Sequence, residues 1–209
     1  MSSPLQQYAE LLLDWNRRIN LTGARTLDQV RAQIADADSL LAASWTSINR
    51  VIDIGSGGGL PAIPLALGRP DIQFTLLEAN ARKSAFLEHV AGTLGIRNVT
   101  VLAGRAEEFG RQPALREQFD RAISRAAARP AVLLELALPF VTPGGDLIAQ
   151  VTPFDPHLLD HAARRLGGGP PRLLWPLAGG SALLVIDKLA PTPNEFPRRV
   201  GLPNRKPLA

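Results

Sequence analysis

The stretch Val51-Ile-Asp-Ile-Gly-Ser-Gly-Gly-Gly-Leu60, followed by Phe74-Thr-Leu-Leu-Glu78, decides the fold of this chain. It predicts a buried strand, a glycine turn, a helix and a second parallel strand that ends in a carboxylate. Glycine at positions 55, 57 and 59 lets the backbone turn sharply and approach a ligand, because no Cβ is in the way. Glu78 follows the turn by roughly twenty residues, where its carboxylate can bind a ribose diol. The stretch therefore indicates a nucleoside-containing cofactor.

The spacing of the glycines separates two classes of cofactor. The dinucleotide fingerprint G-x-G-x-x-G needs glycine at its sixth position, which is Leu60 in this chain. The pattern G-x-G-x-G found here resembles the first motif of methyltransferases that use S-adenosylmethionine, a cofactor without a pyrophosphate. On this motif alone, the alternative is a glycine-rich turn that binds no ligand.

The composition excludes several classes of protein. A chain of 209 residues has room for one substantial core, and its 45% hydrophobic and 20% charged residues are typical of a soluble globular protein. We expect no membrane-spanning segment and no signal peptide, and hence a cytoplasmic location. The absence of cysteine excludes disulfides and thiolate metal sites. His157 and His161 have the i, i+4 spacing of a metal-binding pair, but no third ligand lies near them in sequence, so we expect a solvated helix face and no metal site.

Strands and helices are expected to alternate after Val51, which predicts an α/β fold with a mostly parallel sheet. We expect a helical N-terminal cap over residues 1–46, a Rossmann-like domain over 47–189 and a basic, proline-rich, extended tail over 190–209. The expected strands are 51–54, 73–78, 98–102, 119–124, 145–150 and 182–187, with a seventh at 172–176. The expected helices are 4–17, 27–43, 61–68, 81–95, 130–141 and 156–166.

The strand ends carry the candidate site residues, because ligands bind at the carboxyl ends of parallel strands. Gly104-Arg-Ala-Glu107 follows the third strand. Here the backbone N–H of Ala106 or Glu107 can donate to a ring nitrogen of adenine, and the Glu107 carboxylate can accept from its exocyclic amine. The alternative is a solvated helix start, where the helix dipole favours acidic residues. Ser124-Arg-Ala126 ends the fourth strand, where many amino-methyltransferases of nucleic acids carry an Asn-Pro-Pro-Tyr motif. Its absence argues against transfer to an exocyclic nitrogen and suits an acceptor with an available lone pair.

Arginines are grouped near both ends of the chain, although the net charge is only +4. These clusters suggest a polyanion as partner, because a guanidinium binds phosphate in a planar fork. The alternative is an ordinary solvated surface. The clusters comprise Arg17, Arg18, Arg25 and Arg31 at one end and Arg198, Arg199, Arg205 and Lys206 at the other.

Taken together, these motifs resemble the bacterial ribosomal RNA small subunit methyltransferase G family, also called glucose-inhibited division protein B. The resemblance covers nearly the whole chain. It is carried by Trp15-Asn-Arg-Arg-Ile-Asn-Leu-Thr22, Asp38-Ser-Leu40, Asp53 to Pro61, Arg69-Pro70, Lys83, Phe86-Leu87, Arg105-Ala-Glu107, Ser124-Arg-Ala126 and Gly144-Gly145. It implies a class I S-adenosylmethionine-dependent methyltransferase that acts on ring nitrogen 7 of a guanosine in small-subunit ribosomal RNA.

The resemblance also implies a set of site residues. The cofactor contacts would come from Gly55, Ser56, Gly57, Gly59, Leu60, Glu78, Ala79, Arg105, Ala106, Glu107 and Arg125. Glu78 would bind the ribose, Ala106 and Glu107 the adenine, and Arg125 would be the catalytic residue that orients the substrate. The arginine clusters at the two ends of the chain separately predict the RNA contacts, which are Arg17, Arg18, Arg198, Arg199, Arg205 and Lys206. The partner would be small-subunit ribosomal RNA or the assembling subunit, and the enzyme a monomer that needs neither metal nor membrane.

Three positions depart from the family pattern. Ala35 stands where a histidine is common, Val151-Thr152 replace a Lys-Gly pair, and Ser181-Ala182 replace an Arg-His pair. Two alternatives follow. One is a small-molecule methyltransferase on the same fold. The other is a ribosome- or RNA-binding protein that keeps the cofactor pocket without turnover.

Overall fold

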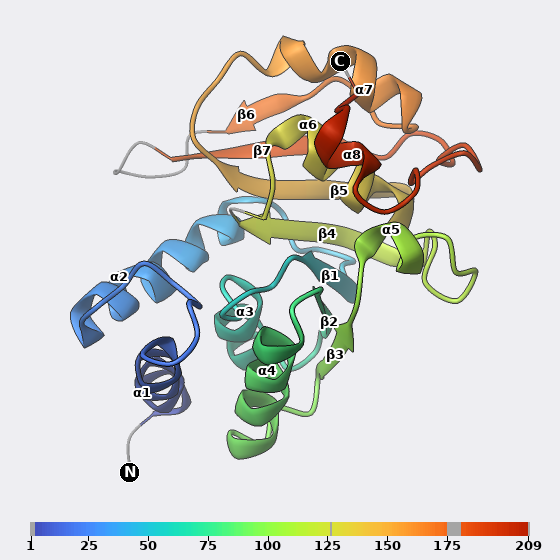
Figure 1. Cartoon of the computed structure of the whole chain (residues 1–209). Coiled ribbons are helices and arrows are strands. Elements are labelled where there is room, and N and C mark those ends of the chain that lie inside the picture. The colour runs from blue at the N-terminus through green and yellow to red at the C-terminus, as the bar shows by residue number, and fades with distance from the viewer. Residues whose placement is uncertain (1–2, 126, 175–180, 209) are drawn as a thin grey trace.

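The computed structural model describes residues 3–125, 127–174 and 181–208. They contain a seven-stranded sheet in the order β3-β2-β1-β4-β5-β7-β6 (Figure 1). The first five strands run parallel, and β7 is antiparallel to its neighbours β5 and β6. This arrangement confirms the mostly parallel Rossmann-like sheet. The strands are β1 Arg50–Ile54, β2 Gln73–Glu78, β3 Val99–Ala103, β4 Phe119–Arg125, β5 Val141–Val151, β6 Arg172–Leu174 and β7 Ala182–Asp187.

Both faces of the sheet are buried, and successive strand residues contribute to two different cores. Val51 and Leu183 pack into the core on one face, whereas their neighbours Ile52 and Leu184 pack into the core on the other. This alternation follows from the two-residue period of a strand. One face is covered by the N-terminal helices with α3 Ala62–Gly68 and α4 Ala81–Thr93, and the other by α6 Pro130–Ala137 and α7 Asp160–Arg165 (Figure 1).

The N-terminal helices share a core with α3 and α4. Helix α1 (Pro4–Asn16) begins at Ser3, whose side chain accepts a hydrogen bond from the Gln6 N–H. Helix α2 (Leu27–Ala37) begins with a reciprocal capping box between Thr26 and Gln29, and continues as one 3-10 turn at Asp38–Ala42. Because the buried side chains of α1 pack against α3 and α4, the N-terminal segment lies against the glycine turn that precedes α3.

The C-terminal segment packs on the α6 face of the sheet instead of extending into solvent (Figure 1, red). Phe196 and Leu208 are only 1% and 5% exposed within the core that contains α6, and Leu202–Arg205 form the short helix α8. The expectation of an extended tail is therefore wrong for the described part of this segment. Its few apolar side chains provide enough contact to anchor it.

Several other expected elements differ in extent. The helix expected over 130–141 ends as α-helix at Ala137, because Pro139 has no N–H to donate to a carbonyl of the preceding turn, and the chain continues as a 3-10 turn at Leu138–Phe140. The helix expected over 156–166 begins with a 3-10 turn at Pro156–Leu159. Helix α5 (Ala106–Phe109) is a single short turn after β3. The strand expected at 172–176 is seen over Arg172–Leu174, and positions 175 and 176 lie outside the described residues.

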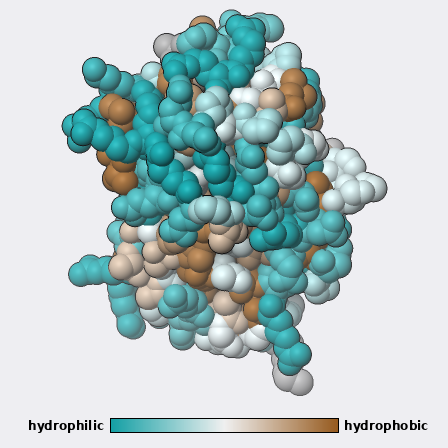
Figure 2. Space-filling view, turned by 90° about the vertical axis from the view of Figure 1, so that its right-hand side faces the viewer, coloured by the Kyte–Doolittle hydropathy of each residue, from teal (hydrophilic) through white to brown (hydrophobic). Residues whose placement is uncertain are grey.

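The surface seen from the side in Figure 2 is mainly hydrophilic in its upper part, with apolar residues showing mostly in the lower part. Within the residues that the structure describes, no helix has both the length and the apolar character needed to cross a bilayer.

Candidate active site

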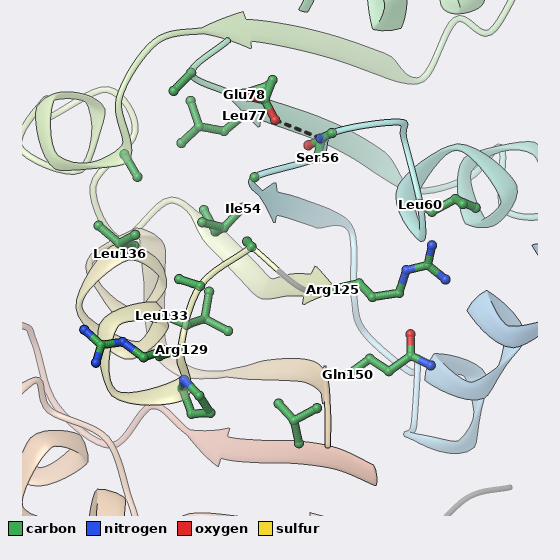
Figure 3. A pocket seen from close by; sticks show the side chains of 18 of the residues that line it. Ile54, Ser56, Leu60, Leu77, Glu78, Arg125, Arg129, Leu133, Leu136 and Gln150 are labelled. Atoms are coloured by element: carbon green, nitrogen blue, oxygen red, sulfur yellow. Dashed lines mark hydrogen bonds between the residues drawn. The ribbon is translucent and has the colours of Figure 1, made fainter. Parts of the chain in front are cut away.

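A large cavity of about 1220 Å³ opens at the carboxyl ends of the parallel strands. Its wall combines the ends of β1, β2, β4 and β5 with residues from the N-terminal helices and from the C-terminal segment (Figure 3). Open α/β sheets bind their ligands at this edge, where the strand order reverses. The reversal here lies between β1 and β4, directly beside the glycine turn.

The glycine turn is held against β2 by backbone hydrogen bonds. The N–H groups of Gly55 and Ser56 both donate to the carbonyl of Leu77, at 2.8 and 3.2 Å. Gly55 has a φ of +72°, and a Cβ added there would lie 2.6 Å from the Ala127 Cβ. Gly59 has a φ of +85°, and its added Cβ would lie 2.6 Å from Ile63. Both positions therefore require glycine on conformational and steric grounds.

The N-terminal helix α1 holds the glycine turn through a side-chain hydrogen bond. The buried Tyr8 hydroxyl donates a 2.6 Å hydrogen bond to the carbonyl of Gly58. Burial raises the pKa of Tyr8, which keeps the hydroxyl protonated and able to donate. The turn is thus fixed by β2 on one side and by α1 on the other.

Glu78, at the end of β2, is oriented by the backbone on both oxygens. Oε2 accepts from the N–H of Gly57 at 2.9 Å (dashed line in Figure 3). Oε1 accepts from the N–H of Asn80 at 2.8 Å. Each carboxylate oxygen retains a second acceptor site. Glu78 therefore lines the cavity in a fixed orientation, with acceptors available for hydroxyl groups.

Asp53 lies beneath the turn and is 1% exposed. Neither carboxylate oxygen has a hydrogen-bond partner within the described part of the chain. Burial raises the pKa of Asp53 to about 7. The Ser56 side chain and the nearby Arg125 oppose this rise, and the carboxylate of Glu78 adds to it, so the charge of Asp53 depends on pH in the neutral range.

On the far side of β2, the short helix α5 presents Ala106 and Glu107 to the cavity. Glu107 accepts from the Arg105 guanidinium at 2.9 Å and from the N–H of Gly201 at 3.0 Å. Burial alone would raise the pKa of Glu107, but these two hydrogen bonds outweigh it and hold the pKa below its ordinary value. A residue of the C-terminal segment therefore fixes the carboxylate that was expected beside the adenine.

At the opposite end of the cavity, Arg125 faces the N-terminal helix α2. Its guanidinium lies 3.6 Å from the carboxylate of Asp36 and 3.4 Å from the carbonyl of Gln33. Gln150, at the end of β5, donates from Nε2 to the same Asp36 oxygen at 2.6 Å. Ala126, which follows Arg125, lies outside the described residues.

The structure brings most of the predicted cofactor residues together on the cavity wall. These are Gly55, Ser56, Gly57, Leu60, Glu78, Ala79, Arg105, Ala106, Glu107 and Arg125. Gly59 is not on the cavity wall and packs against Ile63 of α3. The wall residues Asp36, Gln150 and Asn204 were not among the site residues predicted from the sequence. The position of Gln150 at a strand end was a signal for it, whereas Asp36 and Asn204 lie outside the sheet.

The residues predicted to contact RNA fall into two groups. Arg17 and Arg18 keep 75% and 78% of their side chains exposed, and their pairs with Asp14 are long, at 3.8 and 3.9 Å. Arg199, Arg205 and Lys206 are also exposed. Arg198 differs, because its guanidinium binds the buried carboxylate of Glu135 and the carbonyl of Lys206. The structure therefore favours a structural role for Arg198.

The histidines do not gather with other metal-binding side chains. His157 lies 3.4 Å from Asp160 on an exposed surface. Over residues 3–125, 127–174 and 181–208, no group of three or more histidines and carboxylates is arranged to hold a metal ion.

The sheet order, the hydrogen-bonded glycine turn and the fixed carboxylate of Glu78 at the end of β2 define a class I S-adenosylmethionine-dependent methyltransferase. The fold is similar to that of the S-adenosylmethionine-dependent methyltransferase SibL, with a TM-score of 0.60 and 16% identity over 90% of this chain and 70% of that one. The model of the rRNA small subunit methyltransferase G family matches residues 1–151.

Two relatives support the assignment along nearly the whole chain. The ribosomal RNA small subunit methyltransferase G of Deinococcus deserti is 41% identical over 98% of this chain and 88% of its own length. The protein of the same name from Moorella thermoacetica is 42% identical over 98% of this chain and 89% of its own length. This chain belongs to the ribosomal RNA small subunit methyltransferase G family, and it is an S-adenosylmethionine-dependent enzyme of small-subunit ribosomal RNA.

Proposed function

We propose that this protein transfers a methyl group from S-adenosylmethionine to ring nitrogen 7 of a guanosine, which it takes out of a single-stranded part of small-subunit ribosomal RNA. The observation that carries this is the size and composition of the cavity. At about 1220 Å³ it exceeds the volume of about 300–1,000 Å³ that is typical of pockets for one drug-sized ligand. The cofactor and an unstacked base can therefore occupy the cavity together.

The cofactor would occupy the end of the cavity formed by the glycine turn and α5. The fixed carboxylate of Glu78 would accept from both ribose hydroxyls, and its orientation by Gly57 and Asn80 supports this role. The backbone of Ala106 would bond the adenine ring, and Glu107 would accept from its exocyclic amine. The amino-acid part would pack on residues 55–57.

The chemistry requires alignment more than proton transfer. The in-plane lone pair of nitrogen 7 attacks the sulfonium methyl carbon, while the bond between that carbon and sulfur breaks. The products are S-adenosylhomocysteine and a methylated base that carries the positive charge, and no proton leaves in this step. The protein therefore acts mainly by positioning the two reactants, with Arg125 as the residue that orients the base.

Exposed basic side chains on the N-terminal and C-terminal segments support RNA as the partner. Arg17 and Arg18 on the N-terminal segment and Arg199, Arg205 and Lys206 on the C-terminal segment would contact phosphates. We propose that residues 1–46 form a cap that faces the RNA and that residues 47–189 form the catalytic domain. Residues 190–209 would pack on that domain and stabilise it. The protein would act in the cytoplasm as a monomer on the small subunit or its RNA.

Binding of the cofactor tests the first part of this proposal. Calorimetric titration should show saturable binding of S-adenosylmethionine and S-adenosylhomocysteine. Leu60 replaces the glycine that a pyrophosphate would need, so NAD should not bind. Saturable binding of NAD, with none of S-adenosylmethionine, would overturn the assignment.

The nature of the acceptor is tested by methyl transfer. Radiolabelled S-adenosylmethionine should label unmethylated small subunits or their naked RNA, and the ratio of the two rates identifies the preferred substrate. Labelling of small metabolites alone would favour the small-molecule alternative. Cofactor binding without labelling of any acceptor would favour a binding protein that lacks turnover.

A further inference from the structure

We propose that Asp36 and Gln150 read the Watson–Crick edge of the target guanine and so determine which base is methylated. The inference rests on the proposed function, since it concerns the acceptor end of the same cavity. The two residues come from elements far apart in the chain, because Asp36 lies on α2 and Gln150 at the end of β5. Both line the cavity.

The two side chains form one polar cluster with Arg125. Gln150 Nε2 donates to Asp36 Oδ2 at 2.6 Å, and an Arg125 nitrogen lies 3.6 Å from the same oxygen. Figure 3 shows the side chains of Arg125 and Gln150 extending in the same direction from neighbouring strands. Arg125 and Gln150 lie on β4 and β5, whereas Glu107 follows β3, and β2 and β1 lie between them in the sheet. The cluster is therefore available to the base rather than to the adenine.

An unsatisfied acceptor points to a missing ligand. Gln150 is only 9% exposed, and its Oε1 has no hydrogen-bond partner in the described part of the chain. Leaving a buried polar atom without a partner is destabilising, so such an atom on a cavity wall indicates a place for a donor. Asp36 keeps 41% of its side chain exposed, which leaves its carboxylate accessible from the cavity.

Guanine supplies the donors that this cluster lacks. Its Watson–Crick edge carries two adjacent donors, the ring N1–H and the exocyclic N2–H₂, beside the O6 acceptor. A carboxylate and an amide oxygen can accept from both donors, and the Arg125 guanidinium can donate to O6. Adenine has a ring acceptor in place of N1–H, which a carboxylate would repel. The cluster therefore matches guanine and not adenine.

The charge of Asp36 also fits the reaction. As the methyl group is transferred, the positive charge moves from the cofactor's sulfur onto the guanine ring. This makes N1–H and N2–H₂ stronger donors, so their bonds to a carboxylate strengthen in the transition state. An interaction that strengthens in this way lowers the barrier as well as selecting the base.

The test compares two nucleotides that differ by one group. Inosine monophosphate lacks the exocyclic amine of guanosine monophosphate, and each is titrated by NMR into protein saturated with S-adenosylhomocysteine. The wild-type protein should bind guanosine monophosphate about tenfold more tightly, the effect of one hydrogen bond to a charged group. Asp36→Asn and Gln150→Leu should each bring the ratio of the two affinities closer to 1. Equal binding of the two nucleotides by the wild type, or binding of neither, overturns the inference.

Two controls separate base reading from a structural tether between α2 and β5. Asp28→Asn changes a carboxylate on the same helix, 90% exposed and away from the cavity, and should keep the preference for guanosine monophosphate. A role as a tether predicts instead that Asp36→Asn lowers the melting temperature and leaves the preference intact. The proposed function is tested separately, because the nucleotide titration does not depend on turnover. It fails if the wild-type protein transfers no methyl group to small subunits or to ribosomal RNA.

Discussion

The guanidinium of Arg198 holds the carboxylate of Glu135, which is completely buried within α6. Nε of Arg198 donates to Glu135 Oε1 at 2.8 Å, and a terminal nitrogen donates to Oε2 at 2.5 Å. The Arg198 N–H adds a third bond to Oε1 at 2.8 Å. Helix α6 is otherwise apolar, with the sequence PAVLLELA, so this carboxylate has its partner in the C-terminal segment. The segment therefore completes the fold of the catalytic domain.

Arg198→Ser should destabilise the protein by about 3–5 kcal/mol, because it leaves a buried carboxylate without its partner. Urea unfolding measures this change. The exposed neighbour Arg199 provides the control, and Arg199→Ser should leave the free energy of unfolding unchanged. A stable Arg198→Ser protein with weaker RNA binding would contradict the structural role and restore the role in binding RNA.

Glu78→Ala should weaken binding of S-adenosylmethionine by at least about tenfold, because each hydrogen bond to a charged group contributes about 1.5–3 kcal/mol. Calorimetric titration gives the dissociation constant. Glu108→Ala removes an exposed carboxylate from α5 and should bind the cofactor normally. An unchanged dissociation constant in folded Glu78→Ala would mean that the ribose is bound elsewhere.

The buried Asp53 should make stability depend on pH. Its pKa is about 7 in the folded state and about 4 in the unfolded chain. Between these values the folded protein retains a proton that the unfolded chain has released, so Asp53 makes stability fall as pH rises from about 4 to about 7. The loss is at most about 4 kcal/mol.

Asp53→Asn should remove this contribution, and urea unfolding at several pH values between 4 and 8 measures it. Subtracting the variant's profile from that of the wild type cancels the other titrating groups. A difference that stays constant over this range would show that Asp53 does not titrate there.

Replacing both Arg17 and Arg18 with serine should weaken RNA binding and flatten its dependence on salt. If each contacts one phosphate of a single strand, the slope of log affinity against log salt should fall by about 0.7 per residue. Cofactor affinity and melting temperature should not change, since both side chains are exposed and only loosely paired with Asp14. An unchanged slope would remove these two residues from the RNA-binding surface.

The sequence predicts the sheet and the side of the cavity that the glycine turn and Glu78 form, because those features are local. The strand with its glycine turn and Glu78 form one short supersecondary unit, and the position of the cavity follows from strand topology. The prediction for Arg198 considered its charge without its ion-pair partner Glu135. A signal for that partner existed, since Glu135 is the only charged residue of α6.

The rest of the site depends on contacts that no local pattern encodes. Asp36 and Gln150 are 114 residues apart, and Glu107 and Gly201 are 94 residues apart. Their proximity results from how the N-terminal helices and the C-terminal segment pack on the sheet. Ala35 and Val151, two of the departures from the family pattern, lie next to Asp36 and Gln150 in sequence.

The most direct test of the central claim is the chemical identity of the product. Small subunits that lack the modification are incubated with the protein and S-adenosylmethionine, and the digested ribosomal RNA is analysed by mass spectrometry against authentic methylated nucleosides. We predict the appearance of 7-methylguanosine, and its loss in Glu78→Ala at low cofactor concentration. Methylation of an exocyclic nitrogen or of another base, or no methylation although the cofactor binds, would contradict the account.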